Sequence, residues 1–208
     1  MKYLLLSAAL ALYPFASSAM QVSPLAQTIN PSKNNGSLTI VNTSNEKKEY
    51  QLQAFKWSLV DGKQTRIPID AIRFAPSSFY LDGGKSQVVR FINSETSSAE
   101  LAYRVVVKEK NVKKLETTGV EPVFNMNFPI FWRASDRATV IAKASGSTIV
   151  LRNASPVTAQ IANIDYGTSR RDGLVGYLLP GEEMIISKGN ATSVRALING
   201  VVTELVIE

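Results

Sequence analysis

The stretch Val120–Ser135, VEPVFNMNFPIFWRAS, alternates large apolar residues with other residues in the manner of a β-strand. Successive side chains of a strand point to opposite faces of the sheet, so one face carries Val120, Pro122, Phe124, Met126 and Phe128. Proline lacks the N–H that a hydrogen-bonded ladder requires, which confines a strand containing Pro122 and Pro129 to a sheet edge or a bulge. The stretch therefore predicts an edge strand with large apolar side chains, an arrangement that ordinarily promotes aggregation.

Residues 1–19 have the composition of a secretory signal peptide. Lys2 gives a basic start, an apolar run follows, and Ser18-Ala19 supplies the small residues that a signal peptidase requires. The apolar run is shorter than the roughly 20 residues that span a bilayer. We expect cleavage after Ala19, export of the chain from Met20 onward, and no later membrane span.

The composition excludes several kinds of chemistry. The chain has no cysteine and no histidine, so disulfides, thiolate or imidazole metal sites and Ser-His-Asp triads are impossible. Its 23 Lys and Arg exceed its 17 Asp and Glu, but the charges are scattered and no basic run indicates nucleic-acid binding. Gly83–Ser86 (GGKS) is no phosphate-binding loop, because Phe79 occupies the position where that motif needs another glycine.

Short β-branched or aromatic runs recur along the whole chain, separated by turn dipeptides such as Asp61-Gly62, Asp172-Gly173 and Pro180-Gly181. No segment keeps the i, i+3, i+4, i+7 apolar spacing of a helix between capping residues. This pattern predicts an all-β chain of antiparallel strands, arranged as a sandwich or a barrel.

Two distant segments resemble each other. Gly36–Asn45 (GSLTIVNTSN) and Gly146–Ser155 (GSTIVLRNAS) each run from Gly-Ser through an apolar strand to an asparagine and a short polar turn. This similarity suggests two sandwiches of related plan, with a junction near Arg133–Ala138. We therefore expect an N-terminal domain at 20–133 and a smaller C-terminal domain at 134–208.

The charged segment Glu109–Pro122 comes directly before the unusual strand and is bounded by glycine and proline. Such a composition is typical of a long, solvated hairpin loop. Alternatively, the loop and the strand become ordered together when a partner binds.

Motifs spread over most of the chain follow one another in the order and spacing of a known family: Val22–Pro31, Leu38–Ser44, Gln53–Trp57, Phe74–Phe91, Leu101–Glu109, Phe128–Ala134 and Gly173–Glu182. The last of these contains the Y-x-L-P-G signature, and Trp57 corresponds to the tryptophan of the family. With these motifs the chain resembles the periplasmic pilus-assembly chaperones of the chaperone–usher pathway (PapD-like). Its C-terminal portion is most similar to the archaic, spore-coat-protein-U/Csu-type branch.

The resemblance implies two Ig-like β-sandwiches in a boomerang arrangement. In that family the last strand of the first domain adds to the open sheet edge of a pilin subunit, whose own fold lacks a strand. The resemblance implies that five side chains of this chain enter the subunit's groove: Val120, Pro122, Phe124, Met126 and Phe128. The alternative is that this face packs in the protein's own core, as most apolar strand faces do.

The family also binds the subunit's C-terminal carboxylate with basic residues in the cleft, since a buried carboxylate needs charge-assisted hydrogen bonds. This chain departs from the best-known members, because the segment 20–30 has no basic residue and Pro129 stands where they have a lysine. The anchor, if kept, comes from elsewhere: Arg104 is the first candidate, followed by Arg90 and Arg133. Each of them can instead be an ordinary solvated charge.

The function that the resemblance implies is that of a periplasmic chaperone. It would fold and cap pilus or fimbrial subunits in transient one-to-one complexes and deliver them to an outer-membrane usher, without catalysis, cofactor or metal. A second hypothesis is a secreted structural or adhesive Ig-like protein, such as a pilin, which would share the export signal and the strand pattern. A third is an exported hydrolase with paired carboxylates, but nothing in their spacing distinguishes these from turn and surface residues: Asp165 and Asp172, or Glu182 and Glu183.

Overall fold

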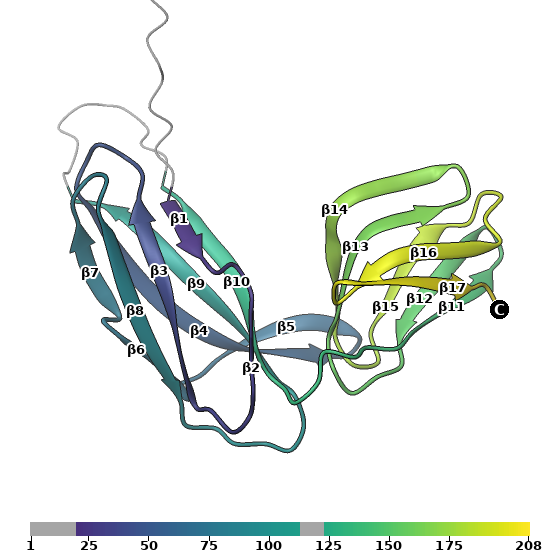
Figure 1. Cartoon of the computed structure of the whole chain (residues 1–208), viewed down its shortest axis with the longest axis horizontal. Helices are drawn as coiled ribbons and strands as arrows, with labels where there is room; N and C mark the ends of the chain where they lie inside the picture. Colours follow the sequence, from purple (N-terminus) through teal and green to yellow (C-terminus); the bar gives the residue numbers. More distant parts are fainter. Residues whose placement is uncertain (1–19, 113–122) are drawn as a thin grey trace, which may run out of the picture.

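The computed structural model describes residues 20–112 and 123–208, and within these ranges the chain forms β-strands and no helix. The strands make four sheets, two at each end of the molecule, and the two pairs meet at an angle like the arms of a boomerang (Figure 1). The predicted all-β class and two-sandwich architecture are confirmed. The proposed signal peptide lies outside the described residues, which contain no helix that is long and apolar enough to cross a membrane.

The first domain packs a four-stranded sheet against a six-stranded one. The smaller sheet has the order β1 (Met20–Ser23), β3 (Asn35–Asn42), β8 (Ser86–Asn93) and β6 (Ile72–Ala75). The larger sheet has the order β2 (Gln27–Ile29), β10 (Asn125–Trp132), β9 (Leu101–Asn111), β4 (Lys48–Val60) and β5 (Lys63–Pro68), and β7 (Ser78–Leu81) also pairs with β4. All these pairs are antiparallel except β2 with β10, which is parallel.

The inner faces of the two sheets supply the core of the first domain because apolar residues alternate along each strand. The largest fully buried side chains of this core are Tyr50, Tyr103, Phe91, Leu38, Ile40 and Ile130. Trp132 lies edge-on to the rings of Phe91 and Tyr103, at centroid distances of 6.0 and 5.6 Å. These aromatic contacts join the two sheets at the end of β10, and they fix that strand in the sandwich.

The second domain is a smaller sandwich of seven described strands. One sheet has the order β11 (Val140–Ser145), β12 (Thr148–Asn153) and β15 (Glu183–Ser187). The other has the order β14 (Ser169–Leu178), β13 (Ala159–Tyr166), β16 (Ser193–Ile198) and β17 (Val201–Val206). It has its own apolar core, and the domain boundary that the sequence predicts falls between the end of β10 and the start of β11.

The two similar segments, Gly36–Asn45 and Gly146–Ser155, form the same kind of turn, one in each domain. In the first domain, Asn42 is 1% exposed. Its side-chain amide donates to the carbonyls of Glu46 and Leu81 at 2.7 and 2.9 Å. Its Oδ1 accepts from the amide and the hydroxyl of Ser44 at 3.0 and 2.7 Å. The buried asparagine side chain thus hydrogen-bonds backbone groups of the turn that have no partner in a β-ladder.

In the second domain, Asn153 makes the same four hydrogen bonds. Its amide donates to the carbonyls of Val157 and Leu178, both at 2.8 Å. Its Oδ1 accepts from the amide and the hydroxyl of Ser155 at 3.0 and 2.6 Å. The short sequence similarity is therefore a structural repeat, and the two domains share a plan at this corner.

Candidate functional site

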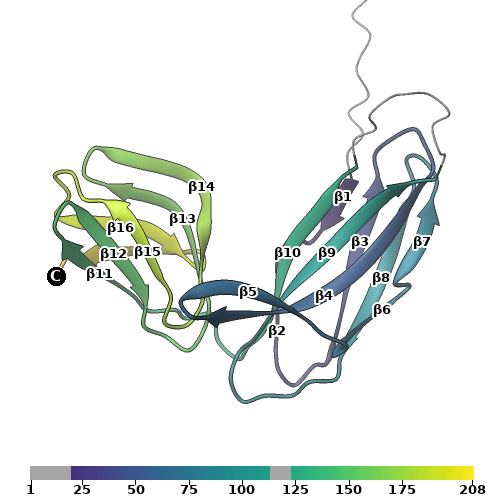
Figure 2. The same cartoon turned by 180° about the vertical axis from the view of Figure 1, so that it is seen from behind.

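Strand β10 has one fully paired edge and one edge that is largely open. Its antiparallel ladder with β9 runs along the whole strand. Its parallel pairing with β2 covers only Ile130–Trp132. Within the described residues, the outer edge of Asn125–Pro129 has no neighbouring strand. This open edge faces the second domain (Figure 2).

The backbone groups at this open edge can be assigned from the ladder. The amide of Glu109 donates to the carbonyl of Phe124 at 2.9 Å, and hydrogen-bonded pairs alternate along an antiparallel ladder. The peptide groups that point away from β9 are therefore those of Asn125, Asn127 and Pro129. Proline has no N–H to leave unsatisfied, which agrees with its predicted place at an edge.

The structure places the predicted partner-binding residues at different depths. Phe124 is 37% exposed, Met126 is partly buried against the core, and Phe128 is 2% exposed within it. Phe128 is therefore a core residue of the first domain, which is the alternative that the sequence left open for this face. Val120 and Pro122 lie outside the described residues.

A cleft of about 740 Å³ lies between the two domains. The first domain contributes the open edge of β10 and single residues of β4, β5 and β9, and the second domain contributes β14, Gln160 of β13 and the start of β15. The lining is mostly apolar and includes Leu25, Met126, Phe128, Leu174, Leu178 and Met184. A cleft of this kind suits an extended apolar segment, and a few polar groups in it can fix the register of that segment.

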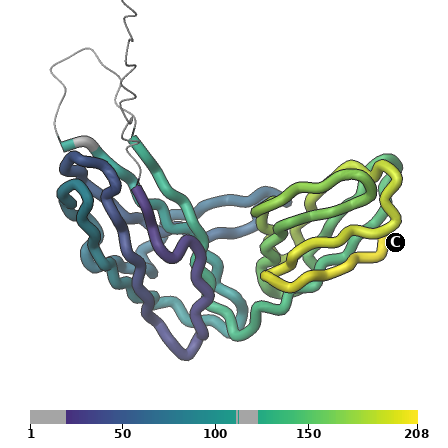
Figure 3. The backbone as a smooth tube through the Cα atoms, turned by 45° about the horizontal axis from the view of Figure 1, so that its top comes forward, coloured from purple at the N-terminus to yellow at the C-terminus, as the bar shows by residue number. Residues whose placement is uncertain are grey.

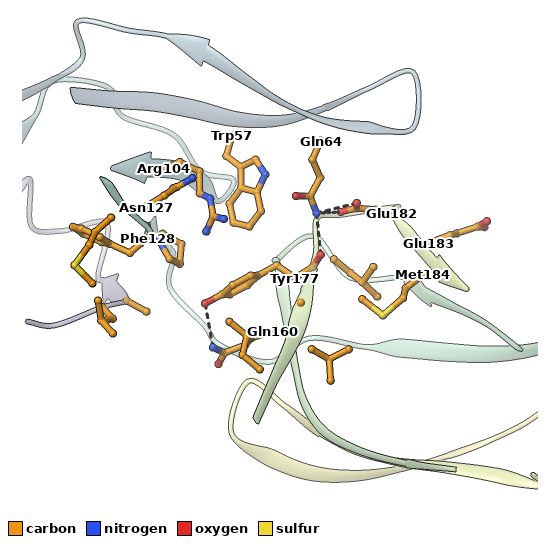
Figure 4. A pocket seen from close by; sticks show the side chains of 18 residues that line it. Trp57, Gln64, Arg104, Asn127, Phe128, Gln160, Tyr177, Glu182, Glu183 and Met184 are labelled. Carbon is orange, nitrogen blue, oxygen red and sulfur yellow. Dashed lines mark hydrogen bonds between the residues drawn. The ribbon is translucent and has the colours of Figure 1, made fainter. Parts of the chain in front are cut away.

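Arg104 is the one Lys or Arg among the described residues that line the cleft. It lies on β9 directly opposite Pro129 of β10. Its guanidinium carbon is 4.3 Å from the ring centroid of Trp57 and 5.8 Å from that of Tyr177 (Figure 4). Burial lowers the pKa of Arg104 below its ordinary value; Arg66 adds to this effect and Tyr177 opposes it. The first anchor candidate thus lies in the cleft, half-buried and stacked on aromatic rings.

Arg133 is buried at the junction of the domains and is already paired with carboxylates. Its Nη1 lies 2.9 Å from Glu100 and its Nε lies 2.7 Å from Asp136. It also donates to the carbonyl of Thr158 at 2.8 Å. Glu100 in turn accepts from the backbone amide of Thr158 at 2.9 and 3.0 Å. Arg133 therefore ties the second domain to the first, and its charge is already neutralised.

Arg90, the remaining anchor candidate, lies on β8 in the other sheet of the first domain and is exposed. It pairs with Ser37 of β3 and Ala75 of β6 in the ladders. It does not line the cleft, so the structure brings Arg104 to the open edge of β10 and leaves Arg90 away from it.

Aromatic and apolar side chains join the domains beside the cleft. Trp57, Ala102 and Phe131 of the first domain form one buried cluster with Leu179 of the second. Tyr177 packs against this cluster and meets the Trp57 ring edge-on at a centroid distance of 5.4 Å. The cluster fixes the aromatic rings that flank Arg104.

The hairpin of β4 and β5 extends from the first domain to the second (Figure 3). The side-chain amide of Gln64, on β5, donates to both carboxylate oxygens of Glu182 at 2.9 Å and to the carbonyl of Tyr177 at 3.0 Å. The Glu182 carboxylate also accepts from the backbone amide of Leu179 at 2.8 Å. All three residues of this contact, Gln64, Tyr177 and Glu182, line the cleft.

Three buried polar side chains lie where β10 begins. The side chains of Glu109 and Lys48 are 2% and 7% exposed, and Lys48 Nζ lies 3.9 Å from Glu109 Oε1. Burial raises the pKa of Glu109, and Lys48 opposes this effect. Burial, together with the charge of Glu109, raises the pKa of Tyr50 to about 12. The backbone amide of Glu109 also donates to the carbonyl of Phe124. Glu109, Lys48 and Tyr50 therefore lie beside the residues where β10 begins to pair with β9.

The carboxylates considered for hydrolysis do not form an acid–base pair with one another in the cleft. Asp165 and Asp172 are exposed, and Asp172 accepts from Arg170 at 2.8 Å. Glu182 is committed to Gln64, and Glu183 is exposed with Arg152 at 4.0 Å. The described part of the chain also contains no cluster of acidic side chains that could hold a metal ion.

The cleft also contains residues whose roles the sequence did not predict. Trp57 and Tyr177 lie in motifs that were recognised, but their contact with Arg104 joins positions far apart in the chain. Gln160, whose side-chain amide donates to the Tyr177 hydroxyl at 3.1 Å, belongs to an ordinary alternating strand. No local signal marks it, because its partner is chosen by the pairing of β13 with β14.

Comparison with solved structures identifies the fold as that of the pilus chaperones of chaperone–usher systems. No family model matches the chain, and no curated protein matches it. The similarity in three dimensions nevertheless extends over almost the whole of the chain.

Three of the similar structures illustrate this. A chain of the CsuC–CsuE chaperone–tip adhesion subunit pre-assembly complex, from the archaic Csu pili of Acinetobacter baumannii, has a TM-score of 0.71 at 16% identity and covers 92% of this chain and 100% of that chain. The Escherichia coli chaperone DraB has a TM-score of 0.70 at 16% identity over 92% of this chain and 98% of its own. A chain of the Salmonella enterica SafA pilin–SafB chaperone complex has a TM-score of 0.70 at 12% identity over 91% and 96%. At such identities the similarity establishes the shared fold.

Proposed function

We propose that the protein is a periplasmic chaperone that folds, caps and delivers pilus subunits by donor-strand complementation. The observation that carries this proposal is the open edge of Asn125–Pro129 beside the interdomain cleft. An unpaired apolar edge strand is normally a route to aggregation, and strand addition to a partner gives it a use.

In the proposed complex, a strand of the subunit pairs with the outer edge of β10. The peptide groups of Asn125 and Asn127 supply backbone hydrogen bonds, and the apolar face of the preceding segment fills the subunit's groove. Phe124 is the exposed described residue of this face, and in the sequence Val120 and Pro122 continue the same alternation. Met126 contributes partly, while Phe128 keeps the strand attached to its own domain.

Arg104 is the proposed anchor for the C-terminal carboxylate of the subunit. It is half-buried, points into the cleft, and has no carboxylate partner among the described residues. A charge-assisted pair formed away from water is stronger and shorter than a neutral hydrogen bond. Binding the chain end here would set the register of the subunit along β10.

The solved structures supply a parallel for the partner class. The Csu structure is a complex of a chaperone with a tip adhesion subunit, and the Saf structure pairs a chaperone with a pilin. By this parallel, the present chain would be exported by its N-terminal signal, bind one subunit at a time, and release it at an outer-membrane usher. No chemical step, cofactor or metal is required.

Co-expression in a bacterial periplasm tests this proposal. Each small exported protein encoded beside the chain is expressed with and without it, and soluble complexes are measured by size exclusion and mass spectrometry. We expect a one-to-one complex that Phe124→Ser weakens about ten- to a hundredfold, because burial of a large apolar side chain contributes about 1.5–3 kcal/mol. Val206→Ser, at a position 74% exposed on β17 of the second domain, is the matched control.

Two results would contradict the proposal. In the first, every neighbouring protein is equally soluble without the chain. In the second, Phe124→Ser and Val206→Ser leave the complex equally intact. Either result would favour a structural or adhesive role for the molecule.

A further inference from the structure

A terminal carboxylate in the cleft needs more donors than Arg104 alone provides. An ionised carboxylate has two oxygens that together accept about four hydrogen bonds, and one guanidinium fork supplies two of them. Burying the carboxylate against the partner without the others is costly. Among the described residues that line the cleft, no second Lys or Arg is present. Glu182 and Glu183 are the charged residues that remain, and they would repel a carboxylate. A second donor must therefore be neutral.

Tyr177 has a hydroxyl hydrogen that is free to act as this donor. Its oxygen accepts a hydrogen bond from Gln160 Nε2 at 3.1 Å, which occupies a lone pair and leaves the O–H. Within the described residues no acceptor contacts that O–H. The bond from Gln160 holds the hydroxyl on the cleft side of the ring, where Figure 4 places both residues.

The surroundings of Arg104 also direct it toward Tyr177. Its guanidinium lies over the ring of Trp57 and beside that of Tyr177. Stacking on an aromatic face leaves the N–H groups at the edge of the guanidinium available for a ligand. The two rings are themselves held edge-on at 5.4 Å, so the arginine has little freedom to turn away.

Two other neutral side-chain donors of the cleft have no hydrogen-bond partner among the described residues: the indole N–H of Trp57 and the amide of Asn127. Trp57 is 5% exposed and packed into the interdomain cluster, which leaves Asn127 as the alternative to Tyr177. The Asn127 side chain is exposed on β10. An exposed amide exchanges water for ligand with little net gain, whereas the Tyr177 hydroxyl is half-buried and already oriented. The observations therefore favour Tyr177.

We propose that the hydroxyl of Tyr177, oriented by Gln160, donates to the partner's terminal carboxylate together with the guanidinium of Arg104. This inference rests on the proposed function and adds a binding residue to it. Arg104 belongs to β9 of the first domain and Tyr177 to β14 of the second, so the chain end of the partner bridges the two domains.

Paired peptides test this assignment. An extended peptide of alternating valine and threonine that ends in leucine is prepared with a free C-terminal carboxylate and as the C-terminal amide. Calorimetry measures the binding of both forms to the full mature chain. The wild type should prefer the acid, and Arg104→Gln should abolish that preference. Tyr177→Phe keeps the ring and should reduce the preference roughly tenfold, the loss expected for a hydrogen bond to a charged group.

Three further variants sharpen the experiment. Gln160→Leu removes the group that orients the hydroxyl and should also reduce the preference for the acid. Tyr80→Phe makes the same chemical change on β7, at a side chain 60% exposed in the first domain, and should leave the preference unchanged. Asn127→Ala should likewise leave it unchanged.

The outcomes separate this inference from the proposed function. The role of Tyr177 is overturned, and the Arg104 anchor stands, if Arg104→Gln abolishes the preference for the acid while Tyr177→Phe retains it in full. The same conclusion follows if Asn127→Ala reduces the preference and Tyr177→Phe does not. If the wild type binds acid and amide equally, the Arg104 anchor fails and the role of Tyr177 fails with it. Formation of the complex in co-expression is measured independently of both.

Discussion

Arg133 and Arg104 both lie where the two domains meet, but their surroundings give them different capacities. Arg133 is held by Glu100 and Asp136 at 2.9 and 2.7 Å, whereas Arg104 contacts aromatic rings. A guanidinium with its charge satisfied contributes to the fold, and one without a carboxylate partner can receive a ligand. The sequence left both residues as candidates because it does not show which distant residues the fold brings next to an arginine.

Arg133→Ala should destabilise the protein by about 3–5 kcal/mol, because it leaves the buried carboxylate of Glu100 without its cation. The Glu100 side chain is 3% exposed, so water cannot replace the lost partner. Urea unfolding measures the difference. Arg90→Ala, at an exposed site, serves as the control and should change stability by no more than about 0.5 kcal/mol. Equal stabilities for the two variants would contradict the structural role of Arg133.

At the scale of elements, β10 combines a part that belongs to its own domain with a part that remains available. Within β10, side chains alternate between the two faces as the sequence pattern indicates, since the side-chain period of a strand is two. It could not predict where along the strand that face leaves the core. That depends on where β2 stops pairing and where the opposite sheet ends, and both are set by residues far away in the sequence.

Phe128→Ala is expected to cost about 3–5 kcal/mol of stability, since it removes a large side chain from a packed core. Phe124→Ala, four residues earlier on the same face and 37% exposed, should cost less than about 1 kcal/mol. Thermal unfolding of the two variants tests this division of β10. Similar losses for both would show that the strand is core along its whole length.

The repeated asparagine turn illustrates what sequence can establish about elements. The segments around Asn42 and Asn153 are similar because each buried amide must satisfy the same set of backbone groups, and few other residues can do so. Gln64, Glu182 and Gln160 have no such local signature. Their hydrogen bonds join positions that only the folded arrangement of the two domains brings together.

At the scale of the whole molecule, the angle between the domains depends on a small set of contacts. These are the cluster around Trp57 and Leu179, the Arg133 network, and the bond of Gln64 to Glu182. Interdomain surfaces within a chain are usually small enough to permit relative motion. Apolar packing, a buried ion pair and a hairpin contact thus join the two domains at separate points.

Leu179→Ala should loosen this junction, because Leu179 is 3% exposed and contributes the second domain's buried apolar contact to the cluster. A loss of about 2 kcal/mol at the interface should separate the unfolding of the two domains into two calorimetric transitions. Ile185→Ala, at a site 69% exposed on β15, should preserve the wild-type profile. A profile for Leu179→Ala identical to that of the wild type would indicate that the domains are not coupled through this cluster.

In the proposed complex, Pro129 has a consequence for how long the partner's strand stays bound. A partner that pairs with the open edge finds amide donors at Asn127 and Asn125, but at Pro129 it finds none. The added ladder therefore lacks a donor at its end beside the cleft, and beyond Pro129 the edge of β10 is already paired with β2. Dissociation can begin at that end one hydrogen bond at a time, so a competing strand can displace the captured one progressively instead of waiting for the whole ladder to break at once.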